Sequence, residues 1–357
     1  MSEKIRVGII GTSPYAEKIH LPAFASHPRA ELAAICGRTQ SRTAAVAAKY
    51  KIPESYADYR KMIAHANFDA VAIIAPDDLH HPMTMAALDA GLHVLCEKPL
   101  ALNVGQAAEM TEKAAQLGVK NMIFFTCRWL PYFRYLKQLI QEDFIGRCYQ
   151  CLICFQMGYG RSGEYVWRLD AERANGALGD LGSHMIDFAQ WCIGEITTVS
   201  AQLTTFVKRH DAGGSPLKQP ANDSAILTLE FANGARGMIH VSAVTPIGDR
   251  GRFHHISFHG DKGSLEANIT RSGGQIYGVR SAEEAFKPLS VPDHIFGASD
   301  RANPYGVFIT ESAGARKFID AIIADRSLEP DFHCGLSVQR VIDAAIASHS
   351  SGRKMVL

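Results

Sequence analysis

The sequence has neither an excess of charge of one sign nor a long apolar run. Its 37 lysines and arginines nearly balance its 36 aspartates and glutamates, which leaves a formal net charge of +1. A balanced charge gives no overall field that would attract nucleic acid or an anionic membrane surface. No apolar stretch approaches the roughly 20 residues that a membrane-spanning helix needs. We therefore expect neither nucleic acid nor a membrane as a partner.

The first ten residues lack the features of a secretory signal. They contain Lys4 and Arg6, but their apolar stretch is short and runs directly into a glycine turn. No cleavage site of small residues follows, so the segment is not interpreted as a signal peptide. We expect a cytoplasmic protein.

Eight cysteines are present, but their spacing does not complete a metal site. Cys148, Cys151 and Cys154 are separated by two residues each, in a stretch that is typical of a β-strand. Alternate residues of a strand face opposite ways, so Cys151 would point away from the other two. No second Cys-x-x-Cys or histidine pair follows. We expect free thiols in a reducing compartment and no bound metal.

The chain opens with a strand, a tight turn and a helix, within a length of 357 residues that is sufficient for two domains. Residues 5–10 form the apolar run of a buried strand, and a helix is predicted from about Ala16. This is the context of the dinucleotide fingerprint G-x-G-x-x-G/A. Gly11 and Ala16 fit its first and third positions, whereas Ser13 replaces the middle glycine and Thr12 precedes it. A plain strand–turn–helix explains the same residues equally well.

The second predicted strand spans residues 31–36, and the loop that follows it is basic. An NAD-binding site usually has a carboxylate at the end of this strand, but Glu31 stands at its start. Arg38, Thr39 and Arg42 would instead suit the 2′-phosphate of NADP. We therefore predict NADP as the preferred cofactor and NAD as the alternative, although basic residues are also common in solvated loops.

Strands and helices continue to alternate along the first third of the chain. Further strands are predicted at 68–75 and 92–96, with a helix at 81–90 between them. This alternation predicts a parallel sheet with ligands at the carboxyl ends of its strands. The residues at such ends are Gly11, Arg38, Pro76 and Lys98. For Lys98, a simple ion pair with a neighbouring carboxylate is an equally good explanation.

A glycine-rich stretch in the middle of the chain places Asp180 four residues before His184, at the entrance of a helix that would run from Ser183 to Gly194. One helical turn brings such residues to the same side. A carboxylate beside an imidazole is a common general acid–base arrangement. The alternative is a helix cap at Ser183 with a solvated aspartate and a surface histidine.

Two motifs taken together resemble the Gfo/Idh/MocA family of NAD(P)-dependent oxidoreductases. They are Glu-Lys-Pro at 97–99 and Gly-Asp-Leu-Gly-Ser-His-Met-Ile-Asp at 179–187. The resemblance extends over essentially the whole chain, including His-Leu-Pro at 20–22 and Gly-Asp-Lys-Gly-Ser at 260–264. It implies an α/β protein with a Rossmann domain, residues 1–124, and a substrate-binding and oligomerisation domain, residues 125–357. The second domain would be an α/β domain with a large, mostly antiparallel open sheet.

The resemblance also implies site residues. Lys98, Asp180 and His184 would be catalytic. Together with the fingerprint, it indicates a cofactor site made of Gly11, Thr12, Ser13, Ala16, Arg38, Thr39, Arg42, Ala75, Pro76, Asp77, His80, Glu97 and Lys98. The substrate would meet Arg128, Trp167, Arg168 and His184. Asp77 stands where many members have asparagine, which departs from the family pattern.

The second half of the chain contains many short stretches with strand character. They lie at 147–157, 196–207, 223–231, 235–243, 253–259 and 263–268. Strands with few helices between them suit an antiparallel sheet. An exposed face or edge of such a sheet needs covering, and another subunit can provide the cover. We expect a homodimer or homotetramer.

These observations predict reversible oxidation of a secondary hydroxyl on a sugar, polyol or related cyclic compound. Two alternatives remain open: a nucleotide-binding regulatory protein without turnover, and an NAD-dependent glycosidase of the same fold. Net formation of reduced cofactor separates the dehydrogenase from both.

Overall fold

A computed structural model describes residues 4–65 and 67–357 of the chain, which divides into two compact units. The first unit extends to Trp129 and also takes in residues 297–299 and 305–336. The second unit contains residues 130–296, 300–304 and 337–357. Each unit is built around one sheet.

The first unit contains a six-stranded parallel sheet in the order β3-β2-β1-β4-β5-β6. Its strands are β1 (Ile5–Ile10), β2 (Ala30–Cys36), β3 (Glu54–Tyr56), β4 (Ala70–Ile73), β5 (His93–Glu97) and β6 (Asn121–Phe124). The strand order reverses direction between β1 and β4, and ligands of doubly wound sheets bind outside the carboxyl ends of the strands at this point. The predicted Rossmann sheet is confirmed.

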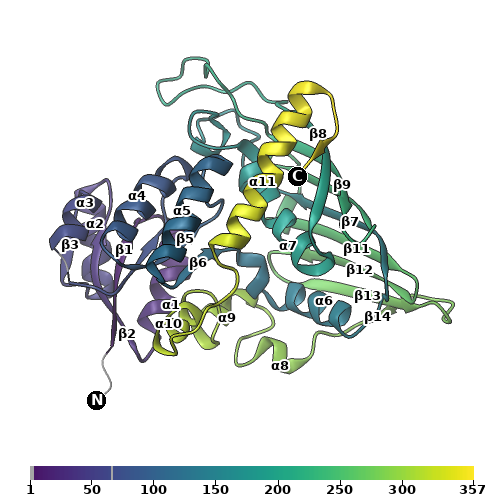
Figure 1. Cartoon of the computed structure of the whole chain (residues 1–357), viewed down its shortest axis with the longest axis horizontal. Helices are drawn as coiled ribbons and strands as arrows, with labels where there is room; N and C mark the ends of the chain where they lie inside the picture. The colour runs from purple at the N-terminus through teal and green to yellow at the C-terminus, as the bar shows by residue number, and fades with distance from the viewer. Residues whose placement is uncertain (1–3, 66) are drawn as a thin grey trace. The chain divides into compact units, whose positions relative to one another are not determined.

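Helices connect the strands of this sheet, and Figure 1 shows α4 and α5 side by side. The helices of this unit are α1 (Leu21–Ala25), α2 (Gln40–Tyr50), α3 (Tyr59–His65), α4 (Asp77–Asp89), α5 (Val104–Leu117), α9 (Val307–Thr310) and α10 (Ala315–Ile323). The ends of α5 follow local sequence rules. The Asn103 side chain accepts a hydrogen bond from Gln106 N at its start, and Gly118 takes a left-handed φ of 65° after its end.

Two predicted helices begin differently in the structure. The helix after the glycine turn is a π-helical turn, η1 (Ala16–His20), followed by the short α1, with Pro22 in the first turn of α1. Helix α4 begins at Asp77, four residues before the predicted start at 81. Acidic residues stabilise the first turn of a helix, so Asp77 and Asp78 carried a signal for the earlier start.

The second unit contains a nine-stranded sheet in the order β14-β13-β12-β11-β7-β10-β9-β8-β15. Its strands are β7 (Cys148–Gln156), β8 (Ile196–Thr204), β9 (Ser224–Phe231), β10 (Arg236–Ser242), β11 (Phe253–Gly260), β12 (Gly263–Thr270), β13 (Gly274–Arg280), β14 (Lys287–Pro288) and β15 (Met355–Val356). All pairs are antiparallel except β7 with β10. The mostly antiparallel open sheet is therefore confirmed, and β13, β14 and β15 are additional to the six predicted strands.

Helices and aromatic side chains cover the inner face of this sheet. The helices are α6 (Pro131–Gln141), α7 (Ser183–Ile193), the short α8 (Asp293–Phe296) and α11 (Phe332–Ser351), whose last residues lie beside β8. Phe133 of α6, Phe188 of α7 and Phe258 of β11 are fully buried together. On β7, Cys151 lies on the buried face with Ile153, whereas Cys154 faces the other side. Within the described residues, no helix is long and apolar enough to cross a membrane.

Candidate active site

In the first unit, β1 is followed by a turn at Gly11 that only glycine can make. Gly11 has a φ of +127°, and a Cβ at this position would overlap the carbonyl oxygen of Ile74. Its amide donates to Cys36 O, and the amide of Ile74 donates to Ile10 O, so the ends of β1, β2 and β4 are tied together. This close approach is what the first glycine of a dinucleotide fingerprint provides.

Ser13 and Ala16 lie in the turn that leads into η1. Ser13 Oγ accepts a hydrogen bond from the amide of Ala16 at 3.2 Å, so the hydroxyl caps the turn. The amide of Glu17 donates to the carbonyl of Ser13. The serine that replaces the middle glycine therefore has a local structural role.

Arg42 lies against this turn. Its Nε donates to Thr12 O at 2.6 Å, and its Nη2 lies 2.7 Å from Glu17 Oε1. Lys49 donates to the other oxygen of Glu17 at 2.8 Å, and this hydrogen bond is the largest cause that lowers the pKa of Glu17. Part of the Arg42 guanidinium is thus engaged by protein groups.

No acidic residue stands at the carboxyl end of β2 itself, although the carboxylate of Asp58 lies near enough to Cys36 to contribute, after burial, to raising the pKa of that thiol. The strand ends at Cys36, and Glu31 is its exposed second residue. Arg38 is exposed just beyond the strand end, and Thr39 is the N-cap residue of α2. Within the described part of the chain, Arg38 forms no ion pair with an acidic side chain. The chain therefore has an arginine just beyond the end of β2, where an NAD-binding site usually has an acidic residue.

His80 connects the carboxyl ends of β4 and β5. Its Nδ1 lies 2.7 Å from Pro99 O and its Nε2 lies 3.0 Å from Ala75 O, and the ring is fully buried. Burial lowers the pKa of His80, and a neutral ring donates to only one of the two carbonyls at a time. Pro76 is the N-cap residue of α4 and Asp77, which is buried, is its first residue.

Glu97 and Lys98 follow one another at the end of β5. Glu97 Oε1 lies 2.7 Å from Nε2 of the buried His20, and its other oxygen accepts from the amide of Lys98 at 3.3 Å. The carboxylate thus supports the backbone at Lys98. In the same unit, the buried Arg128 has its Nη1 3.5 Å from Glu329 Oε2.

In the second unit, Asp180 lies in a π-helical turn, η4 (Leu178–Gly182), which leads directly into α7. Gly182 is therefore helical and Ser183 is not the N-cap, which corrects the capping alternative considered for this stretch. His184 is the second residue of α7 and is nearly buried.

Both carboxylate oxygens of Asp180 accept hydrogen bonds. Tyr159 Oη donates to Oδ2 at 2.7 Å, and Arg168 Nε donates to Oδ1 at 3.1 Å. The Arg168 guanidinium also lies over the Trp167 ring, 4.3 Å from its centroid, in a short 3₁₀ turn. The structure thus brings Trp167, Arg168 and Asp180 together.

The residues that contact these groups but were absent from the sequence-based site include Glu17, His20, Tyr159 and Glu329. His20 belongs to the His-Leu-Pro element of the family resemblance, which could have pointed to it. Glu17 and Tyr159 carry no motif. Tyr159 reaches Asp180 across 21 residues, a distance that sequence spacing does not encode.

The fold and the glycine turn are those of a dinucleotide-binding protein, and comparisons with known proteins identify an oxidoreductase. A family model described as "Oxidoreductase family, NAD-binding Rossmann fold" matches residues 5–125, and the model "GFO/IDH/MocA C-terminal domain" matches residues 133–266. The chain belongs to the Gfo/Idh/MocA family of NAD(P)-dependent oxidoreductases, as the sequence predicted.

Several relatives are sugar dehydrogenases by name. The chain is 28% identical to levoglucosan dehydrogenase of Pseudarthrobacter phenanthrenivorans, over 97% of this chain and 96% of that protein. It is 30% identical to D-glucoside 3-dehydrogenase of Escherichia coli, over 73% of this chain and 76% of that protein. A solved structure of levoglucosan dehydrogenase in complex with NADH matches with a TM-score of 0.89 and 25% identity, over 99% of both chains.

Proposed function

We propose that the protein catalyses the reversible oxidation of a secondary hydroxyl on a sugar, polyol or related cyclic compound, with NADP preferred over NAD. The observation that carries the proposal is the arrangement around Asp180. Asp180 lies in the turn that leads directly to His184, and its carboxylate accepts hydrogen bonds from Tyr159 and Arg168. The sugar dehydrogenases among the relatives support the substrate class.

Three side chains carry the proton chemistry in this proposal. His184 accepts the proton of the substrate hydroxyl, and Asp180 orients the imidazole and stabilises its charged form. Lys98 polarises the substrate oxygen with its positive charge. Arg128, Trp167 and Arg168 contact the substrate, because guanidinium groups donate several hydrogen bonds to hydroxyls and an indole packs against C–H faces. When bound, the nicotinamide supplies hydride transfer.

The preference for NADP rests on the charge at the end of β2. Arg38 is exposed there without an acidic partner among the described residues, and Glu31 lies at the opposite end of the strand. A guanidinium pairs with a phosphate, whereas a carboxylate at this position would favour a ribose hydroxyl. Gly11, Thr12, Ser13 and the segment 75–80 would hold the rest of the dinucleotide.

A panel of sugars and polyols, assayed for reduced cofactor with NADP⁺ and with NAD⁺ separately, tests this function. We expect one substrate class to reduce NADP⁺ faster than NAD⁺, and Lys98→Ala, Asp180→Asn and His184→Ala each to lose at least 100-fold in kcat. Tight cofactor binding without net reduction on the whole panel would instead favour the regulatory or glycosidase alternatives.

The proposal includes assembly into a homodimer or homotetramer through the outer face of the nine-stranded sheet. Large side chains are exposed on this face, including Ile226 and Met238 at 40% and 42% exposure. Charged residues are also present, because Glu230 of β9 pairs with Arg236 of β10 and with Lys354, which precedes β15. Light scattering should give the molar mass of two or four chains, and Met238→Glu should lower that mass toward the mass of a single chain. A monomeric wild type would contradict the assembly.

A further inference from the structure

We propose that Tyr159 is a positioning residue for Asp180, and that the buried ion pair of Arg209 and Asp223 fixes the loop that carries Tyr159. This inference rests on the proposed acid–base role of Asp180. All four residues belong to the second unit.

The first step is the contact at the carboxylate. The hydrogen bond from Tyr159 Oη to Asp180 Oδ2 is 2.7 Å long, and Arg168 Nε donates to the other oxygen, Oδ1, at 3.1 Å. The side chain of Asp180 is only 12% exposed, whereas that of Arg168 is 38% exposed. Hydrogen bonds to a shielded carboxylate are stronger than those to an exposed one, so the bond from Tyr159 contributes to holding the orientation of Asp180.

The second step is the backbone of the loop after β7. The amides of Met157 and Gly160 donate to Ser242 O and Ala243 O, each at 2.8 Å, so both sides of Tyr159 are tied to the end of β10. A Cβ at Gly160 would lie 2.9 Å from Leu169 Cδ1 and 3.0 Å from Arg209 Nη2. A side chain at this position would force its neighbours to shift, so the loop is closely packed here.

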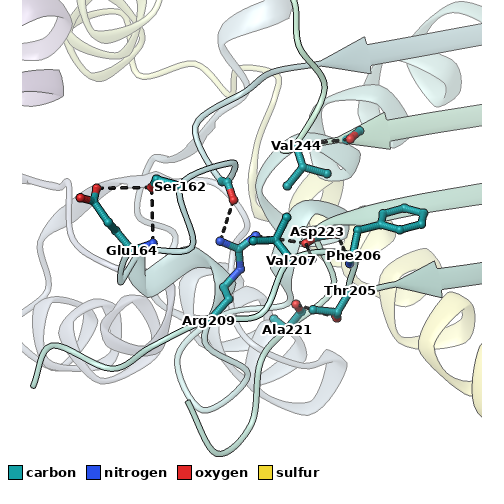
Figure 2. A network of polar contacts seen from close by, with 11 residues as sticks. Ser162, Glu164, Thr205, Phe206, Val207, Arg209, Ala221, Asp223 and Val244 are labelled. Atoms are coloured by element: carbon teal, nitrogen blue, oxygen red, sulfur yellow. Dashed lines mark hydrogen bonds and ion pairs between the residues drawn. The ribbon is translucent and has the colours of Figure 1, made fainter. Parts of the chain in front are cut away.

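The third step is the ion pair behind the loop. Arg209 Nη1 donates to Gly160 O at 2.8 Å, and its Nη2 lies 3.1 Å from Asp223 Oδ2, with both side chains at 0% exposure. Asp223 also accepts from the amides of Phe206 and Val207, at 2.9 and 3.0 Å. Figure 2 shows Arg209 and Asp223 pointing toward one another from two segments of the chain.

A continuous series of contacts thus runs from Asp223 through Arg209 and the Gly160 carbonyl to Tyr159 and Asp180. A buried charge pair with additional donors has little freedom to change its geometry. The hydroxyl of Tyr159 is consequently presented to Asp180 from a fixed backbone. Loss of that hydroxyl removes one donor from the carboxylate and leaves more negative charge beside His184, one helical turn away.

The test compares Tyr159→Phe with Tyr165→Phe. Tyr165 is a matched control because it lies in the same loop and donates to a different carboxylate, Asp170, at 3.1 Å. In Tyr159→Phe, we expect kcat to fall about 10- to 100-fold with KM and NADPH affinity within about twofold of wild type. The acidic limb of the pH profile should move to higher pH. Tyr165→Phe should change none of these quantities.

A second readout needs no substrate. With histidines labelled at carbon-13 and His184 assigned from a His184→Asn spectrum, the titration midpoint of His184 should rise in Tyr159→Phe and stay at the wild-type value in Tyr165→Phe. An unchanged midpoint in Tyr159→Phe, or an equal shift in both variants, overturns the inference.

A failure of the proposed function gives a different result from a failure of the inference about Tyr159. Full activity in Asp180→Asn and His184→Ala would contradict the acid–base role itself. Inactive Asp180→Asn and His184→Ala variants alongside a Tyr159→Phe enzyme with wild-type kcat and pH profile would overturn only the role of Tyr159.

Discussion

Nε2 of His20 lies 2.7 Å from Oε1 of Glu97, and both side chains are buried at the carboxyl end of β5. The residues are 77 positions apart, on η1 and on β5. Glu97 also accepts from the amide of Lys98. One carboxylate therefore connects the first helical turn of the unit with the backbone of the proposed catalytic lysine.

Removing this carboxylate should destabilise the protein. We expect Glu97→Ala to lower the free energy of unfolding by about 1–3 kcal/mol, because it leaves a buried imidazole without its acceptor. Glu97→Gln should cost less, since the amide retains an oxygen that can accept. Urea denaturation without cofactor measures both. Glu109→Ala is the control, because its contact with His81 is similar in length at 2.8 Å but exposed. Equal losses in Glu97→Ala and Glu109→Ala would contradict the prediction.

Arg38 and Arg42 should differ in their effects on cofactor binding. Arg38→Ala should weaken NADPH about 10- to 100-fold and leave NADH almost unchanged, because a charge-assisted bond to phosphate contributes about 1.5–3 kcal/mol. Arg42→Ala should weaken both cofactors, since Arg42 supports the carbonyl of Thr12 in the glycine turn. Calorimetric titration of the binary complexes measures this. A similar loss of both cofactors in Arg38→Ala is the result that counts against NADP preference.

His254 should make the protein sensitive to acid. Its ring is fully buried, stacks on Phe155 at 4.0 Å, and meets the edge of Phe133. Burial lowers the pKa of His254 from 6.5 to about 3. The unfolded chain thus binds a proton that the folded chain rejects. The stability present above pH 6.5 is therefore lost as the pH falls from there toward 3, by up to about 1.4 kcal/mol for each pH unit.

His254→Phe should remove this part of the acid dependence. Urea denaturation between pH 7 and pH 4 compares its slope with that of wild type and of a His255→Gln control, which alters the next residue on the opposite face of β11. The slope should flatten in His254→Phe and persist in the control. A slope that is unchanged in His254→Phe would show that other groups cause the acid sensitivity.

Breaking the Arg209–Asp223 pair should cost more than breaking a surface pair. Arg209→Met leaves the buried Asp223 carboxylate without its counterion, and we expect a loss of about 3–5 kcal/mol in the free energy of unfolding. Lys287→Met removes an exposed pair with Glu283 and should cost far less. In a double-mutant cycle, Arg209→Met combined with Asp223→Asn should cost less than the sum of the single changes. Strict additivity would mean that the two side chains are not coupled.

Local patterns were sufficient for most of the first sheet. The apolar run at 5–10, the glycine turn and the alternation of strands and helices predicted a parallel sheet, because buried parallel strands have continuous apolar sequences. The strands β3, β6, β13, β14 and β15 were not predicted, and β14 and β15 have only two residues each and exist through pairing with a neighbouring strand. The π-helical turn at Asp180 likewise had no distinct sequence pattern.

The sequence by itself determined the family, the two kinds of sheet and the residue types proposed for chemistry, since these depend on local periodicity and on motifs of adjacent residues. Tertiary structure alone decided which groups those residues meet. It placed Glu17 against Arg42, His20 against Glu97 and Tyr159 against Asp180. Such contacts join positions that are 21 to 77 residues apart in the chain. They form only when packed elements bring them within hydrogen-bonding distance, which no local pattern specifies.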